Sequence, residues 1–152
     1  MTPWKKKLCR HCRRLLLIRF VSAFPKSYEF NENEPREFAF CKDAEGNWDV
    51  DHPNYKFWNH LEEVISQLQE MDIESDLILF HPYDRWGFSK LAPEQNETYL
   101  RYLVRRLSAF PGIWWSMANE YDLCFAKSKE EWYKIEEIIK EEDVYDHLLS
   151  NR

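Results

Sequence analysis

The chain has 152 residues and a formal net charge of −6, but its charges are unevenly distributed. Residues 1–19 hold seven Lys or Arg and no acidic residue, whereas the other 133 hold 14 basic and 27 acidic residues. This length suits one domain with a hydrophobic core. The acidic body argues against a nucleic-acid-binding protein, because it would repel phosphates. With three glycines there is no glycine-rich phosphate loop, and no apolar run is long enough to span a membrane.

The four cysteines do not indicate a metal site or a disulfide framework. Cys9 and Cys12 form one CxxC pair, whereas a structural zinc site usually has a second pair of ligands at a distance. We therefore expect no metal and no cofactor. Residues 1–14 lack a helical period and a secretory cleavage site, so we expect a poorly determined basic terminus followed by one domain over 15–152. The localisation stays open, with a soluble cytoplasmic protein favoured because no signal peptide is recognisable.

A continuous apolar run from Leu15 to Phe24 predicts the first strand. Apolar residues at both odd and even positions are typical of a parallel strand that is covered on both faces. Lys26 follows directly after this run. Residues 31–51 are rich in Asn, Glu, Pro and Asp, which predicts a long loop of the kind that is usually functional.

Three amphipathic helices are predicted downstream of this loop. The first is opened by Pro53, the second runs from about Glu94 to Ala109, and the third follows a capping box formed by Ser128 and Glu131. Each has an apolar stripe at steps of three and four residues. The stripes consist of Phe57, Leu61, Val64, Ile65, Leu68 and Met71, then Leu100, Leu103, Val104 and Leu107, then Trp132, Ile135, Ile138 and Ile139.

Two further strands are predicted between these helices, at Ser75–Phe80 and from Ile113 onward, and Leu148 and Leu149 approach a fourth that the chain does not complete. Strands that alternate with helices indicate βαβ units and a parallel sheet. The spacing fits a (β/α) barrel and an open doubly wound sheet equally well.

Polar and aromatic side chains gather after each predicted strand. Residues 81–88 hold an imidazole, a carboxylate, a guanidinium and three aromatic rings, and Asn119 to Asp122 follow the third strand. Active sites of barrels and doubly wound sheets lie at the carboxyl ends of their strands, so we expect one site here. We interpret Glu120 as the catalytic candidate. For His81 alone, a structural role is as consistent as a catalytic one.

Three motifs resemble those of the apiosidase-like glycoside hydrolases, a TIM-barrel family of bacterial carbohydrate enzymes within clan A. They are FPKSYEFNENEP at 24–35, DLILFHPYDRWGF at 76–88 and IWWSMANEYDL at 113–123, and the similarity covers roughly residues 17–150. The resemblance implies an α/β fold that is part of a (β/α)8 barrel. The chain would hold about strands 2–4 with their helices and the start of strand 5.

The resemblance also implies O-glycosyl hydrolysis, with retention, in which Glu120 is the general acid/base and Asn119 binds a sugar hydroxyl. We expect further substrate-binding side chains at the ends of the same strands. These are His81, Tyr83, Asp84, Arg85, Trp86, Lys26 and Tyr121. The partner is then a carbohydrate, with a plant-type oligo- or polysaccharide as a reasonable class, and neither a nucleic acid nor a membrane.

The family's nucleophile is a second Glu on the seventh strand, beyond the last residue of this chain. A retaining glycosidase needs two carboxyl groups about 5–5.5 Å apart, so we predict that the isolated chain is inactive. Half a barrel also has open sheet edges, which favour self-association. Two alternatives stay open: a non-catalytic carbohydrate-binding relic or module, and a half-barrel subunit that assembles with a partner or with a second copy.

Overall fold

The computed structural model describes residues 17–22, 35–82 and 87–150. At its centre is a parallel sheet of four strands in the order β1, β4, β5, β6. The strands span Leu17–Ser22 (β1), Ile73–Phe80 (β4), Ile113–Ala118 (β5) and Leu149–Ser150 (β6). The predicted α/β class with a parallel sheet is therefore confirmed, and the approach at Leu148 and Leu149 does reach a short fourth strand.

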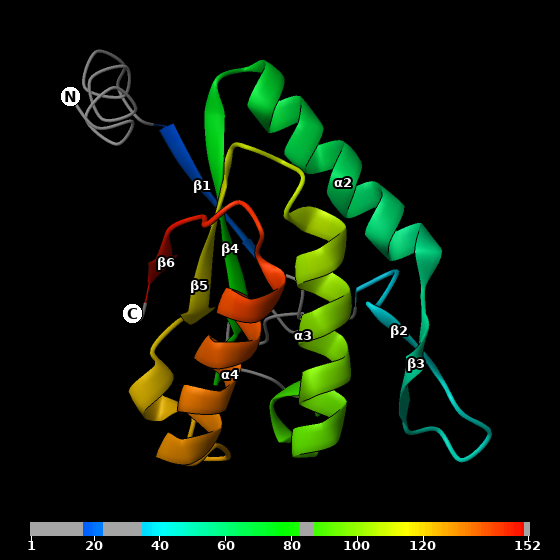
Figure 1. Cartoon of the computed structure of the whole chain (residues 1–152). Helices are drawn as coiled ribbons and strands as arrows, with labels where there is room; N and C mark the ends of the chain where they lie inside the picture. The colour runs from blue at the N-terminus through cyan, green and yellow to red at the C-terminus, as the bar shows by residue number, and fades with distance from the viewer. Residues whose placement is uncertain (1–16, 23–34, 83–86, 151–152) are drawn as a thin grey trace.

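Three helices connect these strands and lie together on one side of the sheet (Figure 1). They are α2 (Tyr55–Glu70), α3 (Pro93–Leu107) and α4 (Lys129–Glu142). Strand order follows chain order, and right-handed crossovers that all step in the same direction place their helices on the same face. None of the described helices is both long and apolar enough to cross a membrane.

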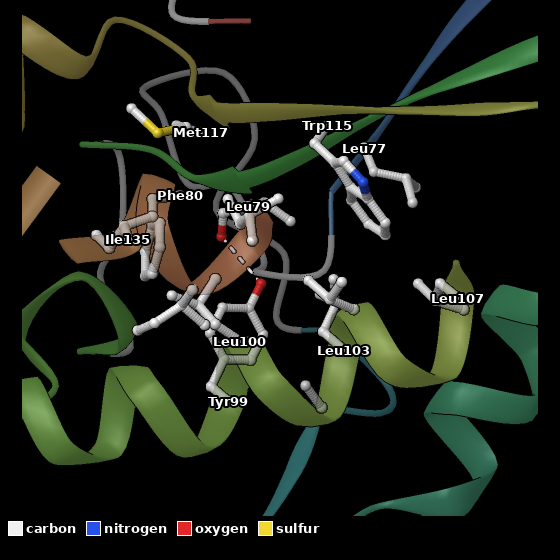
Figure 2. Close-up of a cluster of buried hydrophobic side chains, with 14 of the residues drawn as sticks. Leu77, Leu79, Phe80, Tyr99, Leu100, Leu103, Leu107, Trp115, Met117 and Ile135 are labelled. Carbon is white, nitrogen blue, oxygen red and sulfur yellow. Dashed lines mark hydrogen bonds between the residues drawn. The ribbon is translucent and has the colours of Figure 1, made fainter. Parts of the chain in front are cut away.

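The core lies between the sheet and the helices. Figure 2 shows Leu77, Leu79 and Trp115 pointing from the sheet toward the apolar stripe of α3. The hydroxyl of the fully buried Tyr99 donates a hydrogen bond to the carbonyl of Leu79 at 3.1 Å. The stripes predicted for the second and third helices are buried as expected.

The predicted stripe of the first helix needs correction. Leu61 and Ile65 are buried, but Met71 lies at the C-cap and is 59% exposed. The predicted stripe also omitted Trp58, which is fully buried. Its indole donates a hydrogen bond to the carbonyl of Ala39 at 2.8 Å. The helix itself begins after the N-cap Asn54.

Residues 31–51 are not one long loop, so that prediction is wrong in part. An antiparallel hairpin of β2 (Phe40–Lys42) and β3 (Trp48–Pro53) occupies the described part of this segment and extends past it. Pro53 ends β3 instead of opening a helix. The hairpin packs through apolar side chains: Phe40 at its base is buried, and Trp48, directly after the turn, stacks on Phe88 at a ring-centroid distance of 4.3 Å. The polar residues of the turn interrupt the apolar positions, so the sequence pattern did not predict two strands here.

The strand register brings the ends of β4 and β5 level. Ser75 pairs with Ile113 at one end, and Phe80 pairs with Ala118 at the other. One further hydrogen bond, from the Asn119 amide to the Phe80 carbonyl at 3.0 Å, extends the pairing past the end of β5. The residues that follow the two strands therefore leave the sheet side by side.

Candidate functional site

Strand β5 carries the chain from the core to the surface within a few residues. Its last residue, Ala118, is fully buried, Glu120 is half-buried, and Tyr121 is exposed at the start of the short 3-10 helix η2 (Tyr121–Leu123). A buried strand that ends in this way presents Glu120 at the carboxyl edge of the sheet. This is the edge at which parallel α/β proteins bind ligands.

The backbone of Glu120 lies in the left-handed region, with φ 54° and ψ 56°. For an L-residue other than glycine this conformation costs about 1–2 kcal/mol. Among the described residues, only Asp72 and Asp146 share it outside glycine, and both lie in turns after helices, where Asp is tolerated. Backbone strain at a residue type that does not favour it is typical of functional sites.

The side chain of Glu120 is held by its neighbour. Asn119 donates a hydrogen bond from Nδ2 to Oε2 of Glu120 at 3.1 Å. Within the described ranges, no Lys or Arg forms an ion pair with Glu120. Among the described residues, the Glu120 carboxylate is thus oriented by an amide and not by a cation.

The structure brings His81, Asn119, Glu120 and Tyr121 together at the ends of two neighbouring strands. His81 follows β4 and is almost completely buried, with 3% of its surface exposed. The ring of Tyr121 meets the ring of Trp132 edge-on at 6.2 Å, which holds it against α4. The remaining predicted site residues lie outside the described residues: Lys26, Tyr83, Asp84, Arg85 and Trp86.

Sequence reasoning missed Lys127, which lies in the segment between η2 and α4. Only 8% of it is exposed, and its Nζ lies over the ring of Phe80 at 4.6 Å. Burial lowers the pKa of this amine. No signal in the sequence distinguishes it from a solvated lysine, because its burial depends on a ring supplied by another strand.

The nearby Cys124 is an unreactive thiol. It is buried, and burial raises its pKa to about 11, so it stays protonated at neutral pH. The thiolate is the nucleophilic form of cysteine, so Cys124 is no nucleophile here. In the described part of the chain, no three or more His, Cys, Asp or Glu side chains are placed to hold a metal ion.

Comparison with known proteins shows the family of the chain. The model of a family described as apiosidase-like, catalytic domain, matches residues 21–150. The chain belongs to the apiosidase-like family. This confirms the resemblance that the three sequence motifs indicated, and two of those motifs include the adjacent strand ends described above. No curated protein matches the chain.

Two solved structures resemble this apiosidase-like chain. A candidate glycoside hydrolase from Bacteroides vulgatus is 38% identical with a TM-score of 0.83, and the match covers 99% of this chain and 32% of that one. A second structure, named a glycoside hydrolase, is 16% identical with a TM-score of 0.58, and the match covers 97% of this chain and 32% of that one. At this identity the similarity shows the fold and nothing further. The chain thus spans about a third of the length of the structures it matches.

Proposed function

We propose that this chain contributes the acid/base half of a retaining glycoside hydrolase site, with Glu120 as the general acid/base. The observation that supports this most directly is the strained backbone of Glu120 at the end of β5, combined with the hydrogen bond from Asn119 to its carboxylate. A half-buried carboxyl that an amide orients suits a group that must be held in place while it exchanges a proton with the substrate.

The reaction would proceed in two steps. The protonated carboxyl of Glu120 donates its proton to the glycosidic oxygen as the bond to the anomeric carbon breaks, while a second carboxylate attacks that carbon. The Glu120 carboxylate then takes a proton from water, whose oxygen attacks the anomeric carbon and releases the second carboxylate. Asn119 would orient Glu120 and donate to a hydroxyl of the sugar.

The substrate would be a carbohydrate, and the family description makes apiosides the first compounds to test. A plant-type oligo- or polysaccharide is the natural source that we propose. His81 and Tyr121 would contact the sugar from the ends of β4 and β5. We propose the same role for the predicted residues outside the described ranges, Lys26 and residues 83–86.

We also propose that the fold is part of a (β/α)8 barrel, holding about strands 2–4 and the start of strand 5. Two features support a barrel over a doubly wound sheet. Strand order follows chain order without reversal, and all three helices lie on one face. A doubly wound sheet reverses its strand order and places helices on both faces.

The isolated chain is expected to be inactive, because the second carboxylate would come from a strand that it does not contain. The test uses 4-nitrophenyl apioside with the 152-residue chain and with a chimera in which this chain replaces its counterpart in the Bacteroides vulgatus relative. We expect turnover by the chimera only. Turnover by the isolated chain that Glu120→Gln abolishes would overturn the expected inactivity.

The chimera also tests the assignment of Glu120. Glu120→Gln should abolish its turnover, whereas Glu130→Gln, which changes an exposed acid in the first turn of α4, should leave turnover unchanged. A chimera that hydrolyses the apioside equally well with Glu120→Gln would remove Glu120 from the mechanism.

A second candidate is a half-barrel subunit that completes itself by association. Val144, Tyr145 and Leu148 are 79%, 62% and 63% exposed and directly precede β6, the edge strand of the described sheet. Exposed apolar side chains beside an open sheet edge favour association. This candidate predicts a stable oligomer that Leu148→Lys disrupts. A chain that sediments as a monomer at all concentrations and unfolds cooperatively would exclude it.

A further inference from the structure

Lys127 is buried against the end of β4, and in the described part of the chain it forms no ion pair. Only 8% of it is exposed. Glu131 of α4 attracts it electrostatically, but Oε2 of Glu131 accepts a hydrogen bond from the Ser128 amide at 2.7 Å. Burial lowers the pKa of Lys127, which means that the folded chain keeps this ammonium at a cost in stability. A buried charge of this kind is more typical of a functional site than of a hydrophobic core.

The ring beneath Lys127 is a fixed point of the core. Phe80 is the last residue of β4, is fully buried and belongs to the cluster drawn in Figure 2. The rings of Tyr99 and Trp132 meet it edge-on at 5.6 and 5.9 Å. The Nζ of Lys127 lies 4.6 Å from its centroid, within the distance at which an ammonium is attracted by the negative face of an aromatic ring.

Phe80 also fixes the start of the segment that carries Glu120. Its carbonyl accepts a hydrogen bond from the Asn119 amide at 3.0 Å, and Asn119 in turn donates to the Glu120 carboxylate at 3.1 Å. Residues 119–127 therefore leave Phe80 at its backbone carbonyl and return to it at its ring, where Lys127 lies.

Short hydrogen-bonded turns connect the two ends of this segment. The Leu123 amide donates to the Glu120 carbonyl at 2.9 Å, and the Cys124 amide donates to the Tyr121 carbonyl at 3.1 Å. The Lys127 amide then donates to the Cys124 carbonyl at 3.0 Å. A displacement of Lys127 from the ring would therefore reach Glu120 through a few bonded residues.

We propose that Lys127 is a positioning residue of the site: the contact of its ammonium with the Phe80 ring closes this segment and fixes the backbone of Glu120. The strained conformation of Glu120 requires such a restraint, because strained residues persist only where the surrounding structure fixes them. The effect on catalysis rests on the proposed function, whereas the restraint is a property of the chain itself.

Amide hydrogen exchange of the 152-residue chain, followed by NMR, tests the restraint. Lys127→Met removes the charge and keeps an unbranched side chain. We expect it to speed exchange at Asn119 and Leu123 about tenfold without lowering the global stability. Lys127→Arg should keep the wild-type rates, because a guanidinium stays charged and stacks on rings. Lys129→Met is the matched control, since the Nζ of this exposed lysine lies 5.7 Å from the ring of Tyr133 within α4.

Three outcomes of this experiment would overturn the proposal. The first is wild-type exchange at Asn119 and Leu123 in Lys127→Met. The second is faster exchange throughout the chain with a matching loss of global stability, which would show that Lys127 only stabilises the fold. The third is equally fast exchange in Lys127→Arg, because packing and not charge would then fix the segment. In a Phe80→Leu background, which lacks the ring, Lys127→Met should have no further effect.

Turnover of the chimera tests the consequence for catalysis. Lys127→Met should lower kcat about tenfold with little change in KM, and Lys127→Arg should restore it. A wild-type kcat in Lys127→Met would overturn the catalytic part of the proposal. If no chimera turns over but Lys127→Met still speeds exchange at Asn119 and Leu123, the restraint is supported and the proposed function fails alone.

Discussion

At the scale of single residues, Glu120 combines a reactive group with an unfavourable backbone conformation. This left-handed residue lies between Asn119, whose amide donates to the Phe80 carbonyl, and the start of η2. The conformation lowers the stability of the fold at the position of this carboxylate. Two variants that both lack the carboxylate, of which only one keeps the strain, separate these two effects.

Comparing Glu120→Gly with Glu120→Ala isolates the strain. Both variants lack the carboxylate, but only glycine adopts the left-handed region without steric cost. We expect Glu120→Gly to be more stable than Glu120→Ala by about 1 kcal/mol, measured by urea unfolding. The same pair of substitutions at the exposed Lys134, in the middle of α4, should give the opposite order, because glycine destabilises the interior of a helix. Equal stability of the two Glu120 variants would mean that the turn relaxes.

At the scale of secondary structure elements, a carboxylate pair at the end of α4 joins this helix to its neighbours. Glu142 accepts hydrogen bonds from Arg101 and Arg105 of α3. Asp143, the C-cap of α4, accepts from the Trp115 indole at 2.9 Å and from the His147 amide at 2.7 Å. One junction thus connects α3, α4, β5 and the approach to β6.

The two acids at this junction bind protons less readily in the folded chain. Hydrogen bonds from Arg105, and then from Arg101, lower the pKa of Glu142 to about 2. Burial by itself would raise the pKa of Asp143, but hydrogen bonds from His147 and Trp115 outweigh it and leave this pKa below its ordinary value. Both groups therefore stabilise the fold most when they are ionised.

We expect stability to fall as the pH drops from about 4.5 toward 2. The contribution of Glu142 is fully present above its ordinary pKa of 4.5 and is lost as the pH falls through its folded value. In Glu142→Gln this contribution is absent at every pH. The difference from wild type in urea unfolding should therefore be large at pH 7 and shrink toward pH 2. Glu45→Gln, in the exposed hairpin turn, should follow wild type across the range. A constant difference for Glu142→Gln would contradict the linkage.

At the scale of the whole molecule, the two faces of the sheet differ in chemistry. The face toward the helices is apolar, as Leu77 and Trp115 show (Figure 2). Because side chains alternate along strands, Asp76 and Ser116 point to the opposite face. There the Ser116 hydroxyl donates to the buried Asp76 carboxylate at 2.5 Å and lies 2.9 Å from the Ser150 hydroxyl. This polar row joins β4, β5 and β6.

Removing the middle of the row should cost more than removing its end. Ser116→Ala takes a hydrogen bond away from a buried carboxylate, which costs about 1.5–3 kcal/mol. Ser150→Ala removes only a bond between hydroxyls, worth about 0.5–1.5 kcal/mol. Thermal or urea unfolding of the two variants measures the difference. A larger loss for Ser150→Ala would show that the row is organised from β6 and not from Asp76.

Periodicity in the sequence was enough to predict the central strands, the three helices and the capping box of α4. It could not predict the hairpin, because Phe40, Trp48 and Val50 are separated by polar turn residues and acquire their burial from Phe88 and other residues far along the chain. Strand order also requires three-dimensional contacts. The apolar run before Glu120 predicted its position at a strand end, but neither its strained backbone nor the burial of Lys127 has a local signal.

The hairpin of β2 and β3 has a use that follows from its shape. Its turn at residues 43–47 is closed by the Asp43 carboxylate, which accepts from the amides of Glu45 and Asn47 at 3.0 and 2.8 Å. At Gly46 nothing lies within 4 Å of where a side chain would begin, while the strands of the hairpin are held by Trp48 on Phe88 and by the buried Phe40. An epitope tag or fluorophore grafted at the tip would therefore leave the core untouched and give the molecule a handle for immobilisation.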